Sequence, residues 1–246
     1  MSSARAERHG IERQVVAYGG RETYVLDFSR QVHSEFSKWW YYHDKQTWDT
    51  LSWMGVKVWK YPTDLWIYQE IVFELQPDLI IETGTAFGGS ALYLAHLCDI
   101  LEQGHVLTID IEAREDRPKH DRITYVTGSS TDMASWQTEA IETVLALLTK
   151  AEIDRPDRKT LTILDSDHAA HHVRKELELY APRSDYLIVE DTNLNGHPVR
   201  PKFGLGPYEA VNAFLASAAG AEWERDPARE RLVLTSNPGG YLRRKR

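Results

Sequence analysis

The stretch Leu79-Ile-Ile-Glu82-Thr-Gly84-Thr-Ala-Phe-Gly88-Gly89-Ser90 joins an apolar run to a glycine-rich turn. Residues 79–81 are apolar and mostly β-branched, which is typical of a strand covered on both faces. The three glycines allow a sharp turn and close approach of a ligand, because glycine has no Cβ. Residues 90–101 then predict a helix whose free N–H groups point at the turn. The stretch therefore predicts a nucleotide cradle, although many α/β proteins carry such a turn without a ligand.

The acids near the turn indicate which ligand it holds. Glu82, at the strand end, disfavours a phosphate and favours a ligand with positive charge, such as the ammonium and sulfonium of S-adenosylmethionine. A second apolar run, 105–110, ends in Asp110, 26 residues after Gly84. An acid about 20 residues beyond such a turn typically accepts hydrogen bonds from ribose hydroxyls. An adenosine-containing ligand is therefore expected, although the spacing is not that of a dinucleotide motif.

Composition limits the class of protein. A chain of 246 residues with 42% hydrophobic content can form one sizeable core, so we expect an N-terminal arm and aromatic-rich extension over 1–76 and a core domain over 77–246. The net charge of −8 disfavours a nucleic-acid partner. Cys98 is the only cysteine, and no run is signal-like or long enough to span a bilayer. We expect a cytoplasmic protein with a small-molecule partner and no membrane association.

The first part of the chain is rich in aromatic residues. Residues 1–21 are interpreted as a flexible arm or an oligomer contact. Thirteen Phe, Trp and Tyr residues lie in 24–68, and 27–40 has helical spacing. These rings are interpreted as core or subunit-interface residues, with a stacking wall for a flat or sugar-like substrate as the alternative. Residues 62–76 predict a further helix that leads into the first strand.

The rest of the chain alternates strands and helices. Strands are expected at 123–127, 161–165 and 186–190, helices at 133–150, 169–180 and 207–218, and a terminal hairpin from Trp223 and 231–235. This order predicts an α/β fold with a doubly wound, Rossmann-like, mostly parallel seven-stranded sheet, in which ligands bind at the carboxyl ends of the strands. The long loop 193–206 is a candidate lid, and the basic residues 243–246 are interpreted as a solvated tail.

Four acids follow two of these strands and are expected at the same edge as Glu82 and Asp110. Like charges this close require a cation, and oxygen ligands with open positions suit Mg²⁺ or another divalent cation. Each of the three expected ligands ends a strand or follows one directly: Asp165, Glu190 and Asp191. Asp167 or His168 could then take the proton from a substrate hydroxyl that the metal acidifies. Helix capping would explain one or two of these acids, but not the whole set.

Two further patterns leave alternatives open. Ser129, Ser130 and Asp132 could reach an adenine edge, but the sequence 128–132 also reads as a helix N-cap. His168 and His172, four residues apart, could form a two-histidine, one-carboxylate iron site with Asp165 or Asp167. That site would imply a non-heme iron oxygenase or a hydrolase, and it would leave the glycine turn without a purpose.

Several motifs together resemble the cephalosporin hydroxylase and rhamnosyl O-methyltransferase group of class I S-adenosylmethionine-dependent methyltransferases. They are the glycine turn 82–90, Leu164-Asp-Ser-Asp-His168, Val189-Glu-Asp-Thr-Asn193, Asn195-Gly-His-Pro198 and Gly206-Pro-Tyr-Glu-Ala210. The resemblance implies Mg²⁺ at Asp165, Glu190 and Asp191. It also implies homo-oligomers and hydroxylated substrates, either sugars or secondary metabolites.

The expected cofactor-contacting residues are those of the glycine turn and of the strand ends around it: Glu82, Gly84, Thr85, Gly88, Ser90, Asp110, Ser129 and Asp165. Related sugar methyltransferases carry an Asp-Gly-Asp motif whose second acid is the base, which would be Asp167. Here Ser166 stands in the middle and His168 follows, so either residue is a candidate base.

The main expectation is a Mg²⁺-dependent O-methyltransferase that acts on a rhamnosyl-type sugar or a secondary metabolite in natural-product, including antibiotic, biosynthesis. The resemblance also leaves open a component that acts with a partner protein in methoxylation of a cephalosporin at C7. A non-catalytic partner subunit that keeps a relic cofactor site is a further alternative.

Overall fold

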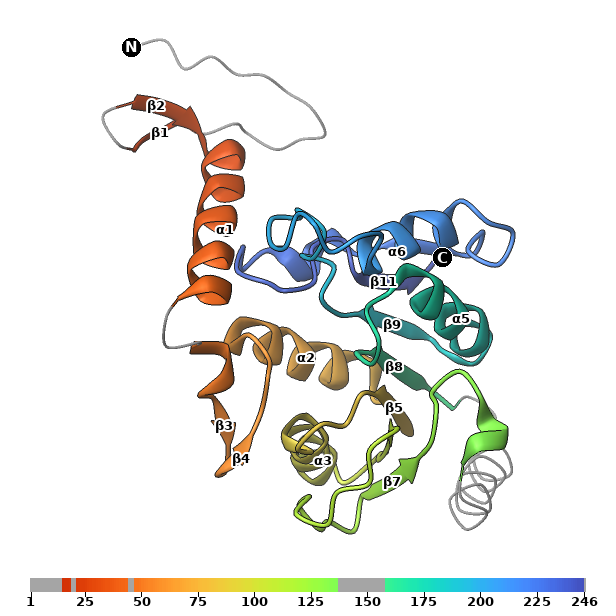
Figure 1. The fold of residues 1–246 in the computed structure, drawn as a ribbon. Coiled ribbons are helices and arrows are strands. Elements are labelled where there is room, and N and C mark those ends of the chain that lie inside the picture. The colour runs from red at the N-terminus through yellow and green to blue at the C-terminus, as the bar shows by residue number, and fades with distance from the viewer. Residues whose placement is uncertain (1–14, 19–20, 44–46, 137–157, 246) are drawn as a thin grey trace.

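A computed structural model of the chain describes residues 15–18, 21–43, 47–136 and 158–245, with only the backbone for 15–18, 21–27 and Met133. Its centre is a seven-stranded sheet in which β5 to β9 run parallel, as expected (Figure 1). Two antiparallel strands, β11 and β10, extend the sheet beyond β9. In spatial order the strands are β10 (Trp223–Arg225), β11 (Tyr241–Arg244), β9 (Tyr186–Val189), β8 (Thr160–Leu164), β5 (Leu79–Thr83), β6 (His105–Asp110) and β7 (Ile123–Thr127).

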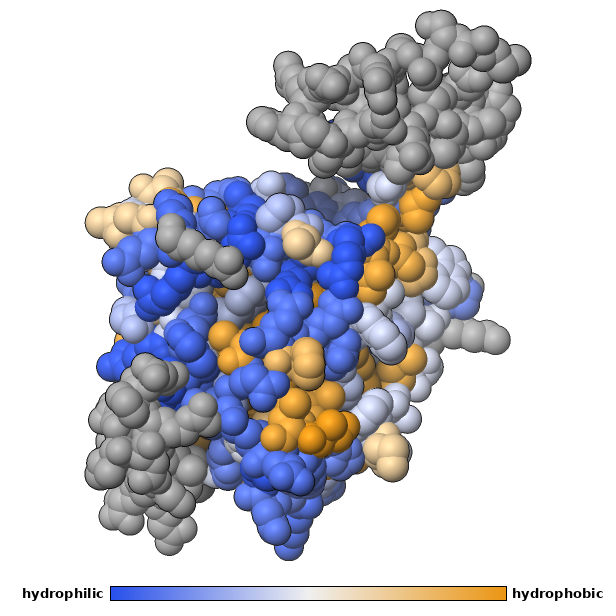
Figure 2. Space-filling view, turned by 180° about the vertical axis from the view of Figure 1, so that it is seen from behind, coloured by the Kyte–Doolittle hydropathy of each residue, from blue (hydrophilic) through white to orange (hydrophobic). Residues whose placement is uncertain are grey.

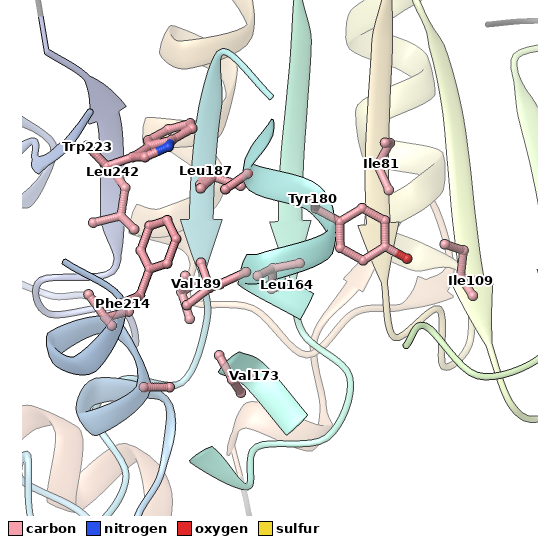
Figure 3. Close-up of a cluster of buried hydrophobic side chains, with 14 of the residues drawn as sticks. Ile81, Ile109, Leu164, Val173, Tyr180, Leu187, Val189, Phe214, Trp223 and Leu242 are labelled. Carbon is pink, nitrogen blue, oxygen red and sulfur yellow. The ribbon is translucent and has the colours of Figure 1, made fainter. Parts of the chain in front are cut away.

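Helices cover both faces of this sheet. On one face α2 (Pro62–Leu75) and α3 (Gly89–Ile100) pack against alternate strand residues, among them Ile80 and Ile163. On the other face α5 (Ala170–Tyr180) and α6 (Pro207–Leu215) pack against the intervening residues, as Figure 3 shows for Val173, Phe214 and Leu187. Both faces are buried, which explains why β5, β8 and β9 are apolar runs without alternation.

The N-terminal part projects from this core. Helix α1 (Val25–Tyr42) stands away from the sheet and carries the hairpin of β1 (Val15–Tyr18) and β2 (Arg21–Tyr24) at its outer end (Figure 1). A 3₁₀ turn (Thr47–Asp49) and the short hairpin of β3 (Ser52–Trp53) and β4 (Val56–Lys57) connect it to α2. Figure 2 shows separate apolar areas on a mostly hydrophilic face, one of them on this arm. Within the described ranges, no helix has the length and apolarity that crossing a membrane requires.

Three expectations for the chain ends and loops need correction or fall outside the described residues. The terminal hairpin forms, but its second strand is Tyr241–Arg244 rather than 231–235. Within 243–245, the described part of the predicted tail, the chain is therefore tied to the sheet: Arg244 Nε donates to the carbonyl of Ser184, and its Nη1 pairs with Glu222 at 2.8 Å. Of the helix expected at 133–150, only a 3₁₀ turn, Met133–Ser135, is described, because 137–157 lie outside the described residues. Two other 3₁₀ turns are Ala181–Arg183 and Pro227–Glu230.

Candidate active site

A cavity of about 740 Å³ opens at the carboxyl ends of the parallel strands. This is the edge at which doubly wound sheets bind ligands, and the volume is typical of a small-molecule site. Gly84, Asp110 and Ser129 line one part of it, after β5, β6 and β7. Residues that follow β8 and β9 line the adjoining part, as the chain order predicts. The predicted residues that reach this cavity are Gly84, Asp110, Ser129, Asp165, Asp167, His168 and Asp191.

Asp110 holds the glycine turn in place as well as facing the cavity. Its Oδ2 accepts a hydrogen bond from the backbone N–H of Ala86 at 2.8 Å, and Arg117 Nη2 lies 3.2 Å from the same oxygen. Oδ1 accepts from the backbone N–H of Glu112 at 2.9 Å. The acid at the end of β6 therefore fixes the turn after β5, and its side chain remains part of the cavity wall.

The remaining turn residues lie beside or beneath the cavity. Glu82 is fully buried and accepts a hydrogen bond from Thr108 Oγ1 at 2.6 Å, and burial raises its pKa. Thr85 is also buried and shares a 2.7 Å hydrogen bond with Thr108. Gly88 is the N-cap of α3, and Ser90 lines a separate small cavity on the α3 side of the turn. The cofactor contacts expected of Glu82, Thr85, Gly88 and Ser90 remain predictions.

Two carboxylates and one imidazole meet after β8 and β9. His168 Nε2 lies 3.3 Å from Asp165 Oδ1 and 3.1 Å from Asp191 Oδ2. The three possible ligand atoms lie within 4.8 Å of one another, and within the described ranges no other group of three such residues comes this close. Burial alone would lower the pKa of His168, but its hydrogen bonds to Asp165 and Asp191 raise it well above its usual value. His168 is therefore held as an imidazolium between two carboxylates, and the three groups have the donor set of a cation site once His168 loses its proton.

Lys60 was not predicted as a site residue, yet it lies among the predicted ligands. Its Nζ is 2.7 Å from Glu190 Oε1 and also pairs with Asp165 Oδ2, and the side chain is 3% exposed. Burial disfavours the ammonium, but Asp165, Glu190 and Glu82 outweigh that effect and raise the pKa of Lys60. The one signal in the sequence was a lysine between Trp59 and Tyr61, two residues before the proline that opens α2.

The three predicted metal ligands therefore have different partners: Glu190 contacts Lys60, Asp191 contacts His168, and Asp165 contacts both. Glu190 does not line the cavity and is 2% exposed, and burial together with nearby Asp165 raises its pKa well above the usual value. Burial would also raise the pKa of Asp165, but Lys60 and His168 hold it below its usual value. Glu190 as a metal ligand remains a prediction.

His172 is held away from His168. Its Nε2 lies 3.0 Å from Ser130 Oγ and 3.1 Å from Ser166 Oγ, and Ser166 Oγ donates to the buried Glu176 at 2.7 Å. The interaction of His172 itself with Glu176 raises the pKa of His172. The two-histidine iron site is therefore not assembled, since the cluster of possible ligands contains His168 but not His172. His172 instead joins the loop after β7 to the loop after β8.

Asp167 is the exposed acid of the loop after β8. Its Oδ1 accepts a hydrogen bond from the backbone N–H of Ala169 at 2.8 Å, just before α5 begins. This contact orders the turn before α5 but is not a helix cap, because Ala169 is the N-cap residue and α5 has no side-chain cap hydrogen bond. Asp132 directly precedes the 3₁₀ turn Met133–Ser135, and its Oδ1 accepts from the backbone N–H of Ala134. Asp167 also lines the cavity, so it has both a structural contact and a place at the site.

The outer wall of the cavity is aromatic. Trp40, Tyr41, Trp48, Trp59 and Tyr61 all line it, and Phe203 and Arg200 come from the loop 193–206. Tyr68 lies in the core, as the first interpretation expects, whereas Trp66 is exposed. The five rings at the cavity stand where a stacking wall would be, and their contact with a substrate remains a prediction.

The loop 193–206 is tied to the body at several points. Glu209, on α6, accepts hydrogen bonds from Asn195 Nδ2 at 3.1 Å and from the backbone N–H of Gly206 at 2.7 Å, and its Oε1 lies 2.9 Å from His197 Nε2. The backbone N–H of Arg200 donates to the hydroxyl of Tyr42 at 2.7 Å. The predicted lid is thus an ordered loop anchored on α6 and α1.

Comparison with known proteins decides the family. The sequence profile described as Rhamnosyl O-methyltransferase/CmcI matches residues 45–245. The chain belongs to this family. It is 38% identical to the rhamnosyl O-methyltransferase of Mycobacterium tuberculosis over 241 residues, which cover 95% of this chain and 92% of the relative. It is 39% identical to that of Mycobacterium leprae over 221 residues, covering 87% and 91%. The expected resemblance is confirmed.

Solved structures confirm the fold of this family member. A CmcI structure described with Mg and S-adenosylmethionine superposes with a TM-score of 0.56 at 20% identity and covers 80% of this chain and 78% of that chain. A CmcI apo-structure gives a TM-score of 0.56 at 22% identity, covering 80% and 77%. The Rossmann-like α/β fold predicted from the sequence is therefore correct.

Proposed function

We propose that this chain is an S-adenosylmethionine-dependent O-methyltransferase that acts, with a divalent cation, on a hydroxyl of a rhamnosyl-type sugar or a secondary metabolite. The observation that carries the proposal is one cavity that joins a glycine turn with its acid, Asp110, to the cluster Asp165, His168 and Asp191. The mycobacterial relatives named rhamnosyl O-methyltransferases and the CmcI structure described with Mg and S-adenosylmethionine support the reaction and the cofactors.

The residues around the glycine turn fit an adenosine-containing cofactor. Asp110 keeps its carboxylate at the cavity wall with the turn fixed around it, and Ser129 lies on the same wall after β7. When bound, S-adenosylmethionine would supply an electrophilic methyl group. The chain would hold it through Gly84, Asp110 and Ser129, and Glu82, Thr85, Gly88 and Ser90 would support the turn from beneath.

The cluster after β8 and β9 fits a divalent cation that displaces the proton of His168, because two carboxylate oxygens and an imidazole nitrogen converge there. Asp165, Asp191 and His168 would hold the cation, which would lower the pKa of a hydroxyl bound beside it. Glu190, the ligand implied by the family resemblance, would act from beneath through its contact with Lys60.

Asp167 is the proton acceptor that the geometry supports. His168 Nε2 already lies between two carboxylates, whereas Asp167 is exposed, lines the cavity and uses only Oδ1 in its hydrogen bond with the backbone of Ala169. The second carboxylate oxygen of Asp167 can therefore accept a proton from a substrate hydroxyl. The aromatic wall would orient the substrate for in-line attack on the methyl group, because aromatic faces pack against sugar rings or flat metabolites.

The decisive test measures cofactor binding by calorimetry and methyl transfer by mass spectrometry. S-adenosylmethionine is titrated into chelator-treated protein and into protein with Mg²⁺, and rhamnosides, other hydroxylated metabolites and a cephalosporin are then screened for gain of one methyl group by mass spectrometry. Methylation of a sugar hydroxyl supports the proposal. Methylation that appears only with a second protein would support the partner-dependent alternative, and absence of cofactor binding would refute the proposal.

A further inference from the structure

Lys60 occupies an unusual position for a lysine. The segment between β4 and α2 carries it into the interior, where the whole residue is 4% exposed. Its ammonium group faces Glu190 Oε1 at 2.7 Å and Asp165 Oδ2, and Glu82 is the third carboxylate that acts on it. A buried ammonium is stable only when carboxylates surround it. The surrounding carboxylates therefore stabilise the charged form of Lys60.

Asp165 is shared between this ammonium and the cluster above it. Oδ2 faces Lys60, whereas Oδ1 faces His168. Glu190 contacts Lys60, which itself lines the cavity, and Asp191, the next residue, contacts His168 instead. The carboxylates at this edge thus have two positively charged partners: Lys60 for Glu190 and Asp165 Oδ2, and His168 for Asp191 and Asp165 Oδ1.

We infer that Lys60 is a permanent internal counter-cation that keeps the acidic edge assembled before a divalent cation binds and that competes with this cation for Asp165 and Glu190. The inference rests on the proposed cation site. Lys60 is then a positioning residue, because its positive charge holds Asp165 and Glu190 in place before any metal ion binds. Binding of the cofactor therefore does not require the metal ion. Lys60 also makes the site a weaker binder of divalent cations than its acids alone would be.

The variant Lys60→Met tests this, because it keeps an unbranched apolar stem and removes the charge. MgCl₂ is titrated into chelator-treated wild-type and variant protein by calorimetry, and S-adenosylmethionine is titrated with and without Mg²⁺. Removal of a charge that opposes cation binding is expected to tighten Mg²⁺ binding about tenfold or more. The variant should also lose about tenfold in cofactor affinity in chelator and regain it with Mg²⁺, whereas the wild type should bind the cofactor equally in both. Lys159→Met, at an exposed pair with Asp185, is the matched control.

The variant Glu190→Gln keeps the test decisive if Lys60→Met does not fold. The inference predicts that Glu190→Gln weakens Mg²⁺ binding much less than Asp191→Asn does, because Glu190 is committed to Lys60. Equal losses in the two variants, or equal Mg²⁺ affinities in wild type and Lys60→Met, would overturn the inference and leave the cation site intact. Absence of Mg²⁺ binding in the wild type would overturn the proposed cation site and the inference together.

Discussion

The backbone carbonyl oxygen of Asp165 lies 1.9 Å from the place that a Cβ on Gly84 would occupy. The ends of β5 and β8 therefore touch through their main chains, and the residue after β5 must lack a side chain. Gly84 also has φ +83°, in the region that favours glycine. This glycine thus brings the turn and the acid cluster together, in addition to any role toward a ligand.

Gly84→Ala should destabilise the fold by about 3 kcal/mol or more, because both a backbone overlap and a strained φ must be relieved. Urea unfolding followed by circular dichroism measures the loss. Gly55→Ala is the control, since Gly55 has φ +84° but nothing within 4 Å of its Cβ position. It should cost only about 1–2 kcal/mol. Equal losses in the two variants would show that the contact with Asp165 is unimportant.

Asp167→Asn should lower kcat about a hundredfold or more while leaving the Kd of S-adenosylmethionine unchanged, because the proton acceptor is lost but the amide oxygen can still accept from the backbone N–H of Ala169. Methyl transfer in a single turnover and calorimetric titration measure the two quantities. Asp132→Asn, at the comparable turn before Ala134, is the control. A variant that retains full turnover would transfer the role of base to His168.

Glu209→Ala should raise the KM for the methyl acceptor about tenfold, because Asn195, His197 and Gly206 lose their common partner and the loop 193–206 loses its order. Cofactor affinity should stay within about twofold, since Glu209 does not line the cavity. Steady-state kinetics separates the two effects. An unchanged acceptor KM would mean that this loop does not shape the substrate site.

His105 should make stability depend on pH. Burial, with Arg122 and His120, lowers its pKa, and its Nε2 lies 2.8 Å from Thr124 Oγ1. Because the folded pKa is depressed, this contribution to stability is fully present above the unfolded pKa of about 6.5 and is lost as pH falls through the folded value. Comparison of unfolding free energies at pH 8 and pH 5 should show a smaller decrease in His105→Gln than in wild type. His171→Gln, at an exposed position, should keep the wild-type decrease.

The sequence was sufficient for the fold because the decisive signals were local. Apolar runs such as 79–81 and 186–189, each followed by a helical pattern, identify buried parallel strands without knowledge of their partners. The last strand was misplaced because Tyr241–Arg244 is half basic, and only its antiparallel pairing with β9 makes it part of the sheet. Arg243 and Arg244 pair with Glu224 and Glu222 there, contacts that periodicity does not reveal.

For the site, the strand-end rule correctly brought Asp110, Asp165 and Asp191 to one cavity. It did not separate Glu190 from Asp191, because adjacent residues after a strand point to different sides and the sequence does not state which side faces the ligand. Lys60 was missed for a different reason: it lies 105 residues before Asp165, on a segment with no strand or helix of its own.

The hydrogen bond between the backbone of Arg200 and the hydroxyl of Tyr42 joins segments 158 residues apart. One wall of the cavity is consequently built from two segments, the aromatic N-terminal segment and the loop after β9, and under the proposed function this wall would face the methyl acceptor. Evolution toward a new acceptor must change both segments in concert. A chimaera that takes only the loop 193–206 from a relative would combine that relative's loop with the aromatic segment of this chain, and the two would not belong to the same acceptor site.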